Sequence, residues 1–230
     1  MKRVDTPEIL DSADCPASEI EASLRDIAGI NRKFGGISTS QALVDRVARA
    51  TGTRRFSLLE VGSGRGEVPN RVAQNLARHG IALDVTLSDL AASHLHGVPR
   101  GSRAFAANAL ALPFRDNAFD LISCNLLAHH LAPDQLSQFV REAFRVSRCA
   151  VLINDLVRHP LHVALVYAGF PFLQSWVSRV DGVRSVRRAY VPKEIREIVA
   201  QGFPQDAAPR VEIFRHYLFR MGIIVWKQKN

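Results

Sequence analysis

Residues 58–66 read Leu-Leu-Glu-Val-Gly-Ser-Gly-Arg-Gly, and this stretch constrains the fold more than any other. The apolar residues predict a buried strand of a parallel sheet. The glycines at positions 62, 64 and 66 predict a sharp turn from that strand into a helix, because a residue without a Cβ atom readily takes positive φ. A ligand can approach such a backbone closely, and the helix that follows presents unpaired N–H groups. The stretch therefore predicts a ligand pocket in an α/β domain.

The spacing of the glycines argues against a dinucleotide as the ligand. The fingerprint G-x-G-x-x-G would place its third glycine at position 67, where this chain has Glu67. A carboxylate is a poor neighbour for a pyrophosphate at a helix N-terminus. A second strand, predicted over residues 83–89, ends in Asp89, and a carboxylate there can accept hydrogen bonds from both hydroxyls of a ribose. Because NAD-binding folds use the same device, Asp89 indicates a nucleoside, and an NAD-binding protein remains an alternative.

Three segments together resemble the class I S-adenosylmethionine-dependent methyltransferases. Glu60 followed by the alternating glycines resembles the first motif of that family, and residues 107–114 and 117–123 resemble the third and fourth motifs. Asn108 stands where the family usually has aspartate, and an amide oxygen can still accept a hydrogen bond from the adenine amino group. The resemblance covers the central half of the chain. It implies S-adenosylmethionine as the cofactor, with contacts from Glu60, Gly62, Ser63, Gly64, Gly66, Asp89, Leu90, Asn108, Ala109, Leu110 and Asn125.

The alternation of strands and helices predicts a single doubly wound α/β domain over residues 1–230. The resemblance implies a mostly parallel seven-stranded sheet with helices on both faces and an antiparallel last strand. Helical spacing of apolar residues predicts an N-terminal helical cover over residues 1–52. Aromatic-rich turns and arginines in residues 156–190 predict a helical lid inserted after the fifth strand. Two closing strands are expected over residues 210–221 and 222–227.

His129 and His130 follow the fourth strand, where an open α/β sheet places its ligands. Methyl transfer to a hydroxyl is an in-line displacement that needs a base for the proton, and an imidazole suits that role. Adjacent residues on a helix point about 100° apart, so we expect at most one histidine to face the substrate. Asp155, at the tip of the fifth strand, is expected to complete the catalytic group by bonding a histidine or a substrate hydroxyl. A helix N-cap is its alternative role.

Four further residues are candidates for contact with the methyl acceptor. An apolar lid excludes water, which favours a small aromatic or lipid-like acceptor. Arg187 and Arg188 can bind an acidic group of that acceptor, although two solvated arginines are the alternative. Asn154 lies at the tip of the fifth strand, and His162 begins the lid, with core packing as its alternative. The acceptor is therefore expected to be a small molecule, acidic or lipid-like in character.

Metal binding and an oxidising compartment are not expected. Adjacent histidines are a poor ligand pair, and no H-E-x-x-H spacing occurs. Cys15, Cys124 and Cys149 lie far apart without a C-x-x-C spacing, which predicts a reducing, cytoplasmic location. The N-terminus lacks the apolar run of a secretory signal, and the apolar residues 161–177 are too short and too interrupted to span a membrane.

The chain carries 30 Lys and Arg against 22 Asp and Glu, a formal charge of +8. Such a balance is typical of nucleic-acid-binding proteins, but the arginines are dispersed and no basic run alternates with aromatics. The segment after the fourth strand also lacks the Asn/Asp-Pro-Pro-aromatic sequence of enzymes that methylate base amines. We therefore expect no nucleic-acid partner, and the charge leaves acidic substrates and peripheral membrane contact open. The sequence does not indicate an oligomeric state.

We interpret the sequence as an S-adenosylmethionine-dependent methyltransferase that acts on a small apolar or aromatic molecule. A phenolic or enolic oxygen is the expected acceptor, on the strength of the histidines and the apolar lid. Methylation of nitrogen, carbon, protein or RNA is the enzymatic alternative. A cofactor-binding protein without transferase activity is the alternative from another class.

Overall fold

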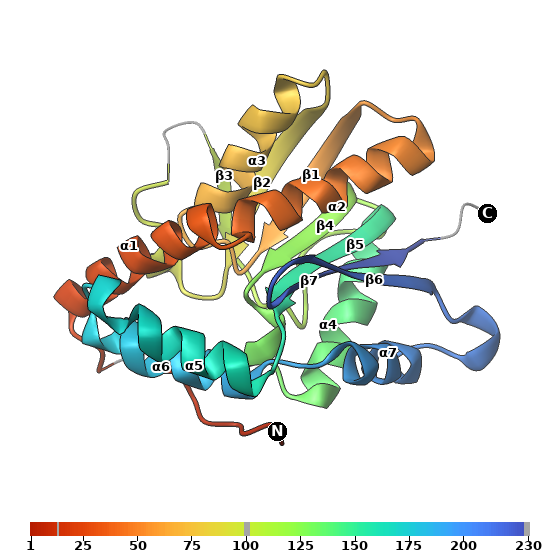
Figure 1. The fold of residues 1–230 in the computed structure, drawn as a ribbon. Helices are drawn as coiled ribbons and strands as arrows, with labels where there is room; N and C mark the ends of the chain where they lie inside the picture. The colour runs from red at the N-terminus through yellow and green to blue at the C-terminus, as the bar shows by residue number, and fades with distance from the viewer. Residues whose placement is uncertain (13, 99–101, 228–230) are drawn as a thin grey trace.

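The computed structural model describes residues 1–12, 14–98 and 102–227, and within them one seven-stranded sheet forms the centre of the molecule (Figure 1). The order of the strands is β3-β2-β1-β4-β5-β7-β6. The strands are β1 (Arg55–Val61), β2 (Ala82–Asp89), β3 (Arg103–Ala106), β4 (Phe119–Asn125), β5 (Ser147–Leu156), β6 (Arg210–Tyr217) and β7 (Arg220–Trp226).

The sheet is parallel from β3 to β5 and antiparallel at its other edge. β1 pairs in parallel with β2 and β4, and β4 pairs in parallel with β5. β7 runs antiparallel to both β5 and β6. This arrangement confirms the predicted fold class, but the two closing strands are separated at residues 218–219 and not between 221 and 222. The strand order reverses between β1 and β4, which is where open α/β sheets bind ligands at their carboxyl ends.

Helices cover both faces of the sheet (Figure 1). The helices are α1 (Ala17–Lys33), α2 (Gly36–Thr51), α3 (Glu67–Ala77), α4 (Pro133–Val146), α5 (Pro160–Gly169), α6 (Trp176–Arg188) and α7 (Pro192–Gln201), with 3₁₀ turns η1 (Ala92–Leu95), η2 (Ala128–His130), η3 (Phe170–Phe172) and η4 (Gln205–Ala207). No helix in the described part of the chain is both long enough and apolar enough to span a membrane.

Two buried clusters, one on each face, hold the helices to the sheet. Leu58 belongs to the cluster under α2 and α3, whereas its neighbour Leu59 belongs to the cluster under α4 and α7. This division follows from the alternation of side chains along a strand, which sends successive residues to opposite faces. Phe139 of α4 is completely buried in the second cluster. The run of apolar residues in the central strands is thus explained by burial on both faces.

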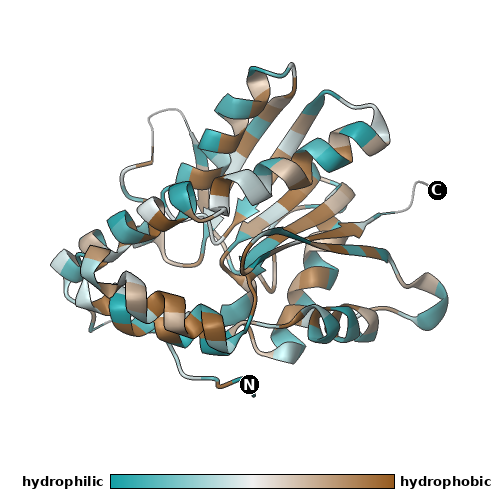
Figure 2. Ribbon diagram, in the orientation of Figure 1, coloured by the Kyte–Doolittle hydropathy of each residue, from teal (hydrophilic) through white to brown (hydrophobic). Residues whose placement is uncertain are grey.

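The predicted lid is formed by α5, η3 and α6, which follow β5 directly. No residue of α5 is buried, although its sequence is strongly apolar, as its brown colour in Figure 2 shows. In the predicted cover, α1 packs against α6, and α2 packs against α3 and the sheet. The lid and the cover therefore contact each other beyond the carboxyl edge of the sheet.

Candidate active site

The glycine turn after β1 has the conformation that its sequence predicts. Gly62, Gly64 and Gly66 all have positive φ, between 50° and 75°. A Cβ atom added at Gly66 would lie 2.5 Å from a methyl carbon of Leu87, so the turn leaves no room for a side chain there. The backbone N–H of Ser63 donates to the carbonyl of Ser88 at 2.9 Å. The glycine turn is thereby fixed against the carboxyl end of β2.

Asp89 lies at that end of β2 and is almost completely buried. Its Oδ2 accepts a hydrogen bond from the backbone N–H of Gly64 at 2.9 Å, and its Oδ1 lies 3.2 Å from Nδ1 of His94. Burial raises the pKa of Asp89, but the bonds from His94 and Gly64 outweigh it and hold the pKa below its usual value. Leu90 beside it is 74% exposed, an apolar side chain left open at the edge of the turn. An ionised acid and an apolar surface thus lie next to the glycines, as a nucleoside site requires.

The segment that resembles the third motif lies beside Asp89. The backbone N–H of Ala107 donates to the carbonyl of Asp89 at 2.9 Å. The Oδ1 atom of Asn108 accepts from the backbone N–H of Leu110 at 2.9 Å, so this oxygen stabilises its own turn. Ala109 and Leu110 pack against the core. The predicted contacts of these residues with adenine stay predictions.

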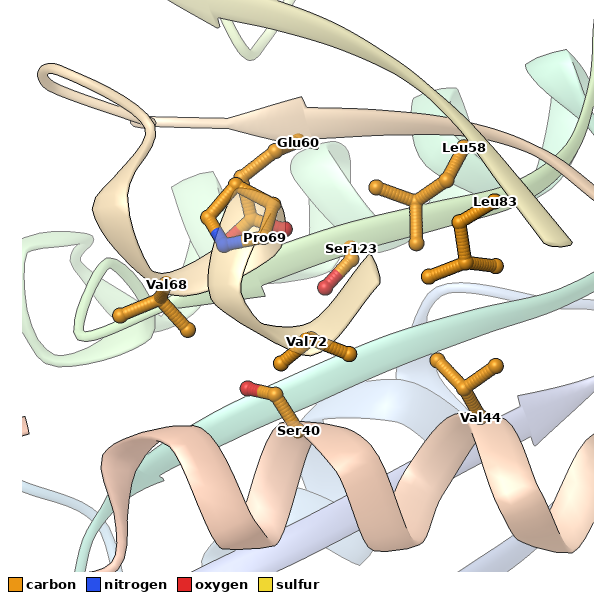
Figure 3. Close-up of a pocket in the computed structure, with 9 residues that line it drawn as sticks. All are labelled: Ser40, Val44, Leu58, Glu60, Val68, Pro69, Val72, Leu83 and Ser123. Carbon is orange, nitrogen blue, oxygen red and sulfur yellow. The ribbon is translucent and has the colours of Figure 1, made fainter. Parts of the chain in front are cut away.

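Glu60 lines a small cavity between α2, α3 and the sheet (Figure 3). Its carboxyl group is hydrogen-bonded to Ser123, and Ser40 of α2 lies on the other side of the same cavity. Burial raises the pKa of Glu60 to about 7, only partly opposed by the bond with Ser123. Its predicted contact with the cofactor stays a prediction.

His129 in the η2 turn and Asp155 in β5 form a buried pair. Nδ1 of His129 lies 2.7 Å from Oδ1 of Asp155, whose Oδ2 accepts from the backbone N–H of His129 at 3.1 Å. Burial lowers the pKa of His129, but the carboxylates of Asp155 and Glu8 outweigh it and raise the pKa to about 10. Asp155 lies within β5, and His159 is the N-cap of α5, so the alternative role of Asp155 as an N-cap is wrong.

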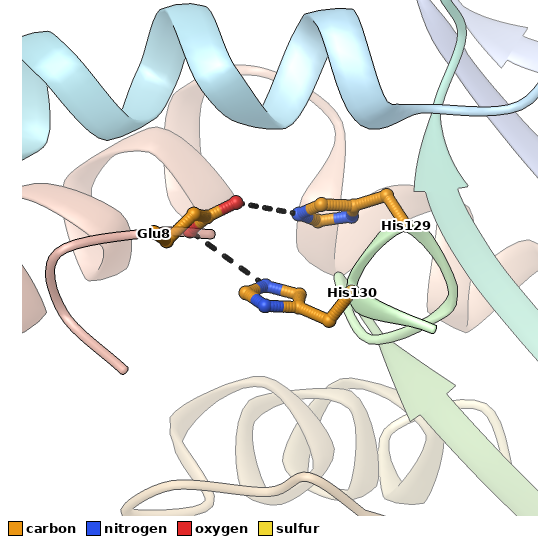
Figure 4. Close-up of side chains that lie close together, drawn as sticks. All are labelled: Glu8, His129 and His130. Carbon is orange, nitrogen blue, oxygen red and sulfur yellow. Dashed lines mark ion pairs between the residues drawn. The ribbon is translucent and has the colours of Figure 1, made fainter. Parts of the chain in front are cut away.

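Both histidine rings converge on one carboxylate, Glu8 (Figure 4). Nε2 of His129 lies 3.4 Å from one oxygen of Glu8, and Nε2 of His130 lies 3.7 Å from the other. The ring centroids are 4.4 Å apart. The expectation that the two rings would point apart is wrong. It assumed a regular helix and ignored side-chain rotation. The two histidines lie in a three-residue 3₁₀ turn, and both rings reach the carboxylate of Glu8 between them.

Glu8 and Asp11 also belong to this cluster, although no sequence pattern indicates them. Burial raises the pKa of Glu8, but His129 and His130 outweigh it and lower the pKa to about 2. Asp11 accepts from Nδ1 of His130 at 2.9 Å, across 119 positions of sequence. Neither acid belongs to a recognisable motif: Pro7 and Ile9 flank Glu8, and Leu10 and Ser12 flank Asp11.

Residues 1–12, which we call the N-terminal strap, are held along α6. The backbone N–H groups of Ile9 and Leu10 donate to the two oxygens of Asp181, each at 2.9 Å. Arg3 donates to the carbonyl of Arg188 at 2.7 Å, and its guanidinium lies 4.7 Å from the ring centre of Tyr190. These contacts with the lid hold the strap in place, and they thereby position Glu8 beside the histidines.

Two predicted acceptor contacts, Asn154 and Asn125, belong to a polar network inside the protein. Asn154 is buried, and its Nδ2 donates to the carbonyl of Gly36 at 2.7 Å and to Ser40 at 2.9 Å. The guanidinium of Arg220 donates to the side-chain oxygens of Asn125 and Asn154, at 3.1 and 3.3 Å. These contacts hold β4, β5, β7 and α2 together. The predicted contact of Asn125 with the cofactor and that of Asn154 with the substrate stay predictions.

The remaining predicted acceptor contacts lie in three different surroundings. His162 stacks on Phe219, with ring centroids 4.9 Å apart, and its Nδ1 lies 3.1 Å from the carbonyl of Val157. Arg188 is buried and donates to the carbonyl of His130 at 2.7 Å. Arg187 is exposed. The structure thus brings Arg188 to the histidines but leaves Arg187 at the surface.

Several solved methyltransferase structures have the same fold. The plantazolicin methyltransferase BpumL in complex with SAH is 11% identical, with a TM-score of 0.69 over 95% of this chain and 92% of that one. The plantazolicin methyltransferase BamL, in complex with a triazolic desmethylPZN analog and SAH, is 13% identical, with a TM-score of 0.67 over 91% and 89%. A SAM-dependent methyltransferase from Aquifex aeolicus is 16% identical, with a TM-score of 0.54 over 79% and 88%. None of the curated proteins matches the sequence.

Residues 59–150, from β1 to the start of β5, match the family model described as a methyltransferase domain. This segment contains the glycine turn, Asp89 and the turn at Asn108. The chain therefore has the fold of these methyltransferases, and residues 59–150 match a methyltransferase domain. The matched domain is that of an enzyme, a methyltransferase, and the BpumL and BamL structures with the same fold hold SAH.

Proposed function

We propose that this methyltransferase acts on a small apolar or aromatic molecule and transfers the methyl group to a phenolic or enolic oxygen. The observation that carries the proposal is the apolar lid. Its exposed side chains, each more than 40% accessible, are Leu161, Leu165, Tyr167, Phe172 and Trp176. Exposed apolar surface of this extent marks a site of contact with an apolar partner, and here it lies on the element inserted beyond β5.

The cluster at η2 supports an oxygen acceptor. His130 is the better candidate for the base, because its side chain is 23% exposed whereas His129 is buried and holds its proton. An imidazole whose Nδ1–H is held by a carboxylate, as Asp11 holds that of His130, presents its Nε2 as a proton acceptor. In the proposed step the hydroxyl proton passes to this nitrogen. The oxygen attacks the methyl carbon, and the bond to sulfur breaks to leave S-adenosylhomocysteine.

The predicted cofactor residues take part in the same proposal. Asp89 would accept the ribose hydroxyls, the glycine turn would pass beneath the amino-acid part of the cofactor, and Leu90 would pack on the adenine. Arg188, next to His130, would attract an acidic acceptor. Asp155 and His129 would hold the turn that presents His130.

The test is a methyl-transfer assay with four groups of small acceptors: phenols, enolisable 1,3-dicarbonyls, aromatic amines and azole-containing peptides. The last group is included because the complexes of BamL contain an azole-based analog. We expect S-adenosylhomocysteine to form with phenols or dicarbonyls, and mass spectrometry to place the added methyl on oxygen. Products methylated only on nitrogen or carbon would overturn the oxygen assignment.

The role of His130 has a separate test. His130→Ala should lower kcat by about 10²–10⁴-fold with a neutral phenol while leaving the affinity for S-adenosylhomocysteine unchanged. An acidic nitrophenol, already ionised at the assay pH, should recover most of the lost rate because it needs no base. An equal loss with both acceptors would exclude His130 as the proton acceptor.

A further inference from the structure

The two histidines and Glu8 form a closer group than an ordinary ion pair. One ligand atom from each of Glu8, His129 and His130, a carboxylate oxygen or a ring nitrogen, lies within 4.8 Å of the other two (Figure 4). Four ligand atoms around a zinc ion, each at about 2.0–2.2 Å, lie about 3.3–3.6 Å apart in a tetrahedron. Nε2 of His129 lies 3.4 Å from Oε1 of Glu8, and Nε2 of His130 lies 3.7 Å from Oε2, so each histidine is near that spacing from one oxygen of the carboxylate. A small rotation of the partly exposed His130 ring would bring its Nε2 to the ligand spacing of a tetrahedral site.

The far side of each histidine is arranged as in a metal ligand. Nδ1 of His129 is bonded to Asp155 at 2.7 Å, and Nδ1 of His130 is bonded to Asp11 at 2.9 Å. Metal-binding histidines almost always donate their other N–H to a carboxylate, a carbonyl or water, which fixes the tautomer and aims Nε2 at the ion. Glu8 is also held in place, because its Oε1, the oxygen that faces His129, accepts a hydrogen bond from Ser185 at 2.6 Å. All three ligands therefore have an outer partner.

The charge and the accessibility of the group also suit a cation. Three carboxylates, those of Glu8, Asp11 and Asp155, surround two imidazoles. The nearby guanidinium groups of Arg3 and Arg188 contact backbone carbonyls and Asp5. The side chain of Asp11 is 47% exposed, so an ion can enter past it and past His130, while Glu8 and His129 close the inner side.

We propose that Glu8, His129 and His130 bind one divalent transition-metal ion, and that Zn²⁺ fits the site best. Imidazole ligands favour zinc over magnesium and calcium, which prefer oxygen, and two histidines with one glutamate are a known zinc set that keeps a position open. The ion would fasten the N-terminal strap to the η2 turn. This proposal departs from the expectation from sequence that the chain holds no metal.

The open position gives the ion a catalytic consequence, and this consequence rests on the proposed function. An acceptor oxygen bound to Zn²⁺ would lose its proton to water, and the resulting oxyanion would attack the methyl carbon as the sulfur leaves. In the metal-bound enzyme His130 would then be a ligand, and ionisation of the acceptor would no longer depend on a base. The binding site itself does not depend on this step.

The test uses the full chain without an affinity tag, freed of metal by a chelator. Titration with Co²⁺ should give visible absorption bands of a four- or five-coordinate site that saturate at one ion per chain, and Zn²⁺ should abolish them. Glu8→Gln and His130→Ala should each weaken binding by at least about 100-fold. Asp11→Asn, an exposed change that keeps the fold, should weaken it by about 10–100-fold. The matched control His79→Ala, which removes an exposed imidazole after α3, should bind as the parent does.

Each outcome decides the proposal. The proposed site would be overturned if the absorption bands were absent, or if the parent, Glu8→Gln and Asp11→Asn bound Co²⁺ equally well. Unchanged affinity for S-adenosylhomocysteine would show that each variant is folded. Specific Co²⁺ binding without methylation of any oxygen acceptor would support the site and overturn the proposed function. Methylation that persists after chelation and needs His130 would overturn the catalytic consequence and support the base.

Discussion

At the scale of single residues, the proposed cofactor site depends on a few backbone and carboxylate contacts. Asp89 is the central residue, since its side chain joins the end of β2 to the N–H of Gly64 in the glycine turn. The low pKa of Asp89 means that it is ionised throughout the neutral range and can accept charge-assisted hydrogen bonds. Its removal should therefore affect cofactor binding more than folding.

Asp89→Ala should weaken the binding of S-adenosylhomocysteine by about 1.5–3 kcal/mol, the usual loss for hydrogen bonds to a charged group. Isothermal titration calorimetry measures the change, and Asp84→Ala, an exposed acid earlier in β2, is the control. Equal affinities for the two variants would exclude Asp89 as the ribose ligand.

Gly66→Ala should lower the free energy of unfolding by about 1–3 kcal/mol. The reason is that Gly66 has a φ of 75° and an added Cβ would lie 2.5 Å from Leu87. Gly29→Ala is the matched control, because Gly29 lies within α1 with nothing within 4 Å of the added atom. Urea denaturation should show the control unchanged or slightly more stable. A similar response of both variants would mean that the turn tolerates a side chain.

At the scale of elements, the N-terminal strap and the lid form one unit around the histidines. Asp181 of α6 receives two backbone hydrogen bonds from the strap, and Glu8 completes the cluster at η2. The lid in turn contacts the cover, because α1 packs against α6. Loosening the strap should thus be visible both in its own dynamics and at the cluster.

Asp181→Asn should speed amide hydrogen exchange of residues 9 and 10 by about 10–100-fold, since it weakens two charge-assisted bonds. Exchange detected by mass spectrometry measures this, and Asp206→Asn at the exposed η4 turn is the control. Unaltered exchange in the strap would show that other contacts hold it.

Phe172→Ser should raise the KM for an apolar acceptor several-fold with little change in stability, because this side chain is 85% exposed. Steady-state kinetics with the acceptor found in the screen measures the effect. The affinity for S-adenosylhomocysteine should not change. A KM equal to that of the parent would mean that η3 does not contact the acceptor.

At the scale of the whole molecule, the buried carboxyl group of Glu60, beside the cluster under α2 and α3, lowers the stability of the fold at high pH. The pKa of Glu60 is about 7 in the folded protein, against 4.5 as its ordinary value. The folded chain therefore binds more protons than the unfolded chain between these pH values. The protonated carboxyl group of Glu60 makes its full contribution to the free energy of unfolding below pH 4.5, and this contribution is lost as the pH rises through 7.

Glu60→Gln should remove this pH dependence. The free energy of unfolding of the parent should fall by up to about 3 kcal/mol more than that of the variant between pH 5 and pH 8. Urea denaturation at pH 5, 6.5 and 8 measures both slopes, and their difference isolates Glu60 from the other titrating groups. Parallel slopes would show that the carboxyl group is already ionised in the folded protein.

The sequence by itself determined the features that depend on neighbouring residues. The strand before Gly62, the positive φ of the glycines, the acid at the end of β2 and the alternating elements of a doubly wound sheet all follow from local patterns. The pairing of Asp155 with His129 could also be anticipated, since parallel strands bring their carboxyl ends to one edge.

Only the tertiary structure decided what surrounds the histidines. Glu8 and Asp11 reach His129 and His130 because the strap is bound to α6 by hydrogen bonds that no sequence pattern encodes. The direction of each imidazole is likewise set by its partners, which lie on β5 and on the strap. Contacts between residues more than a hundred positions apart depend on how the whole chain packs, whereas a turn or a strand depends on the conformational preferences of its own residues.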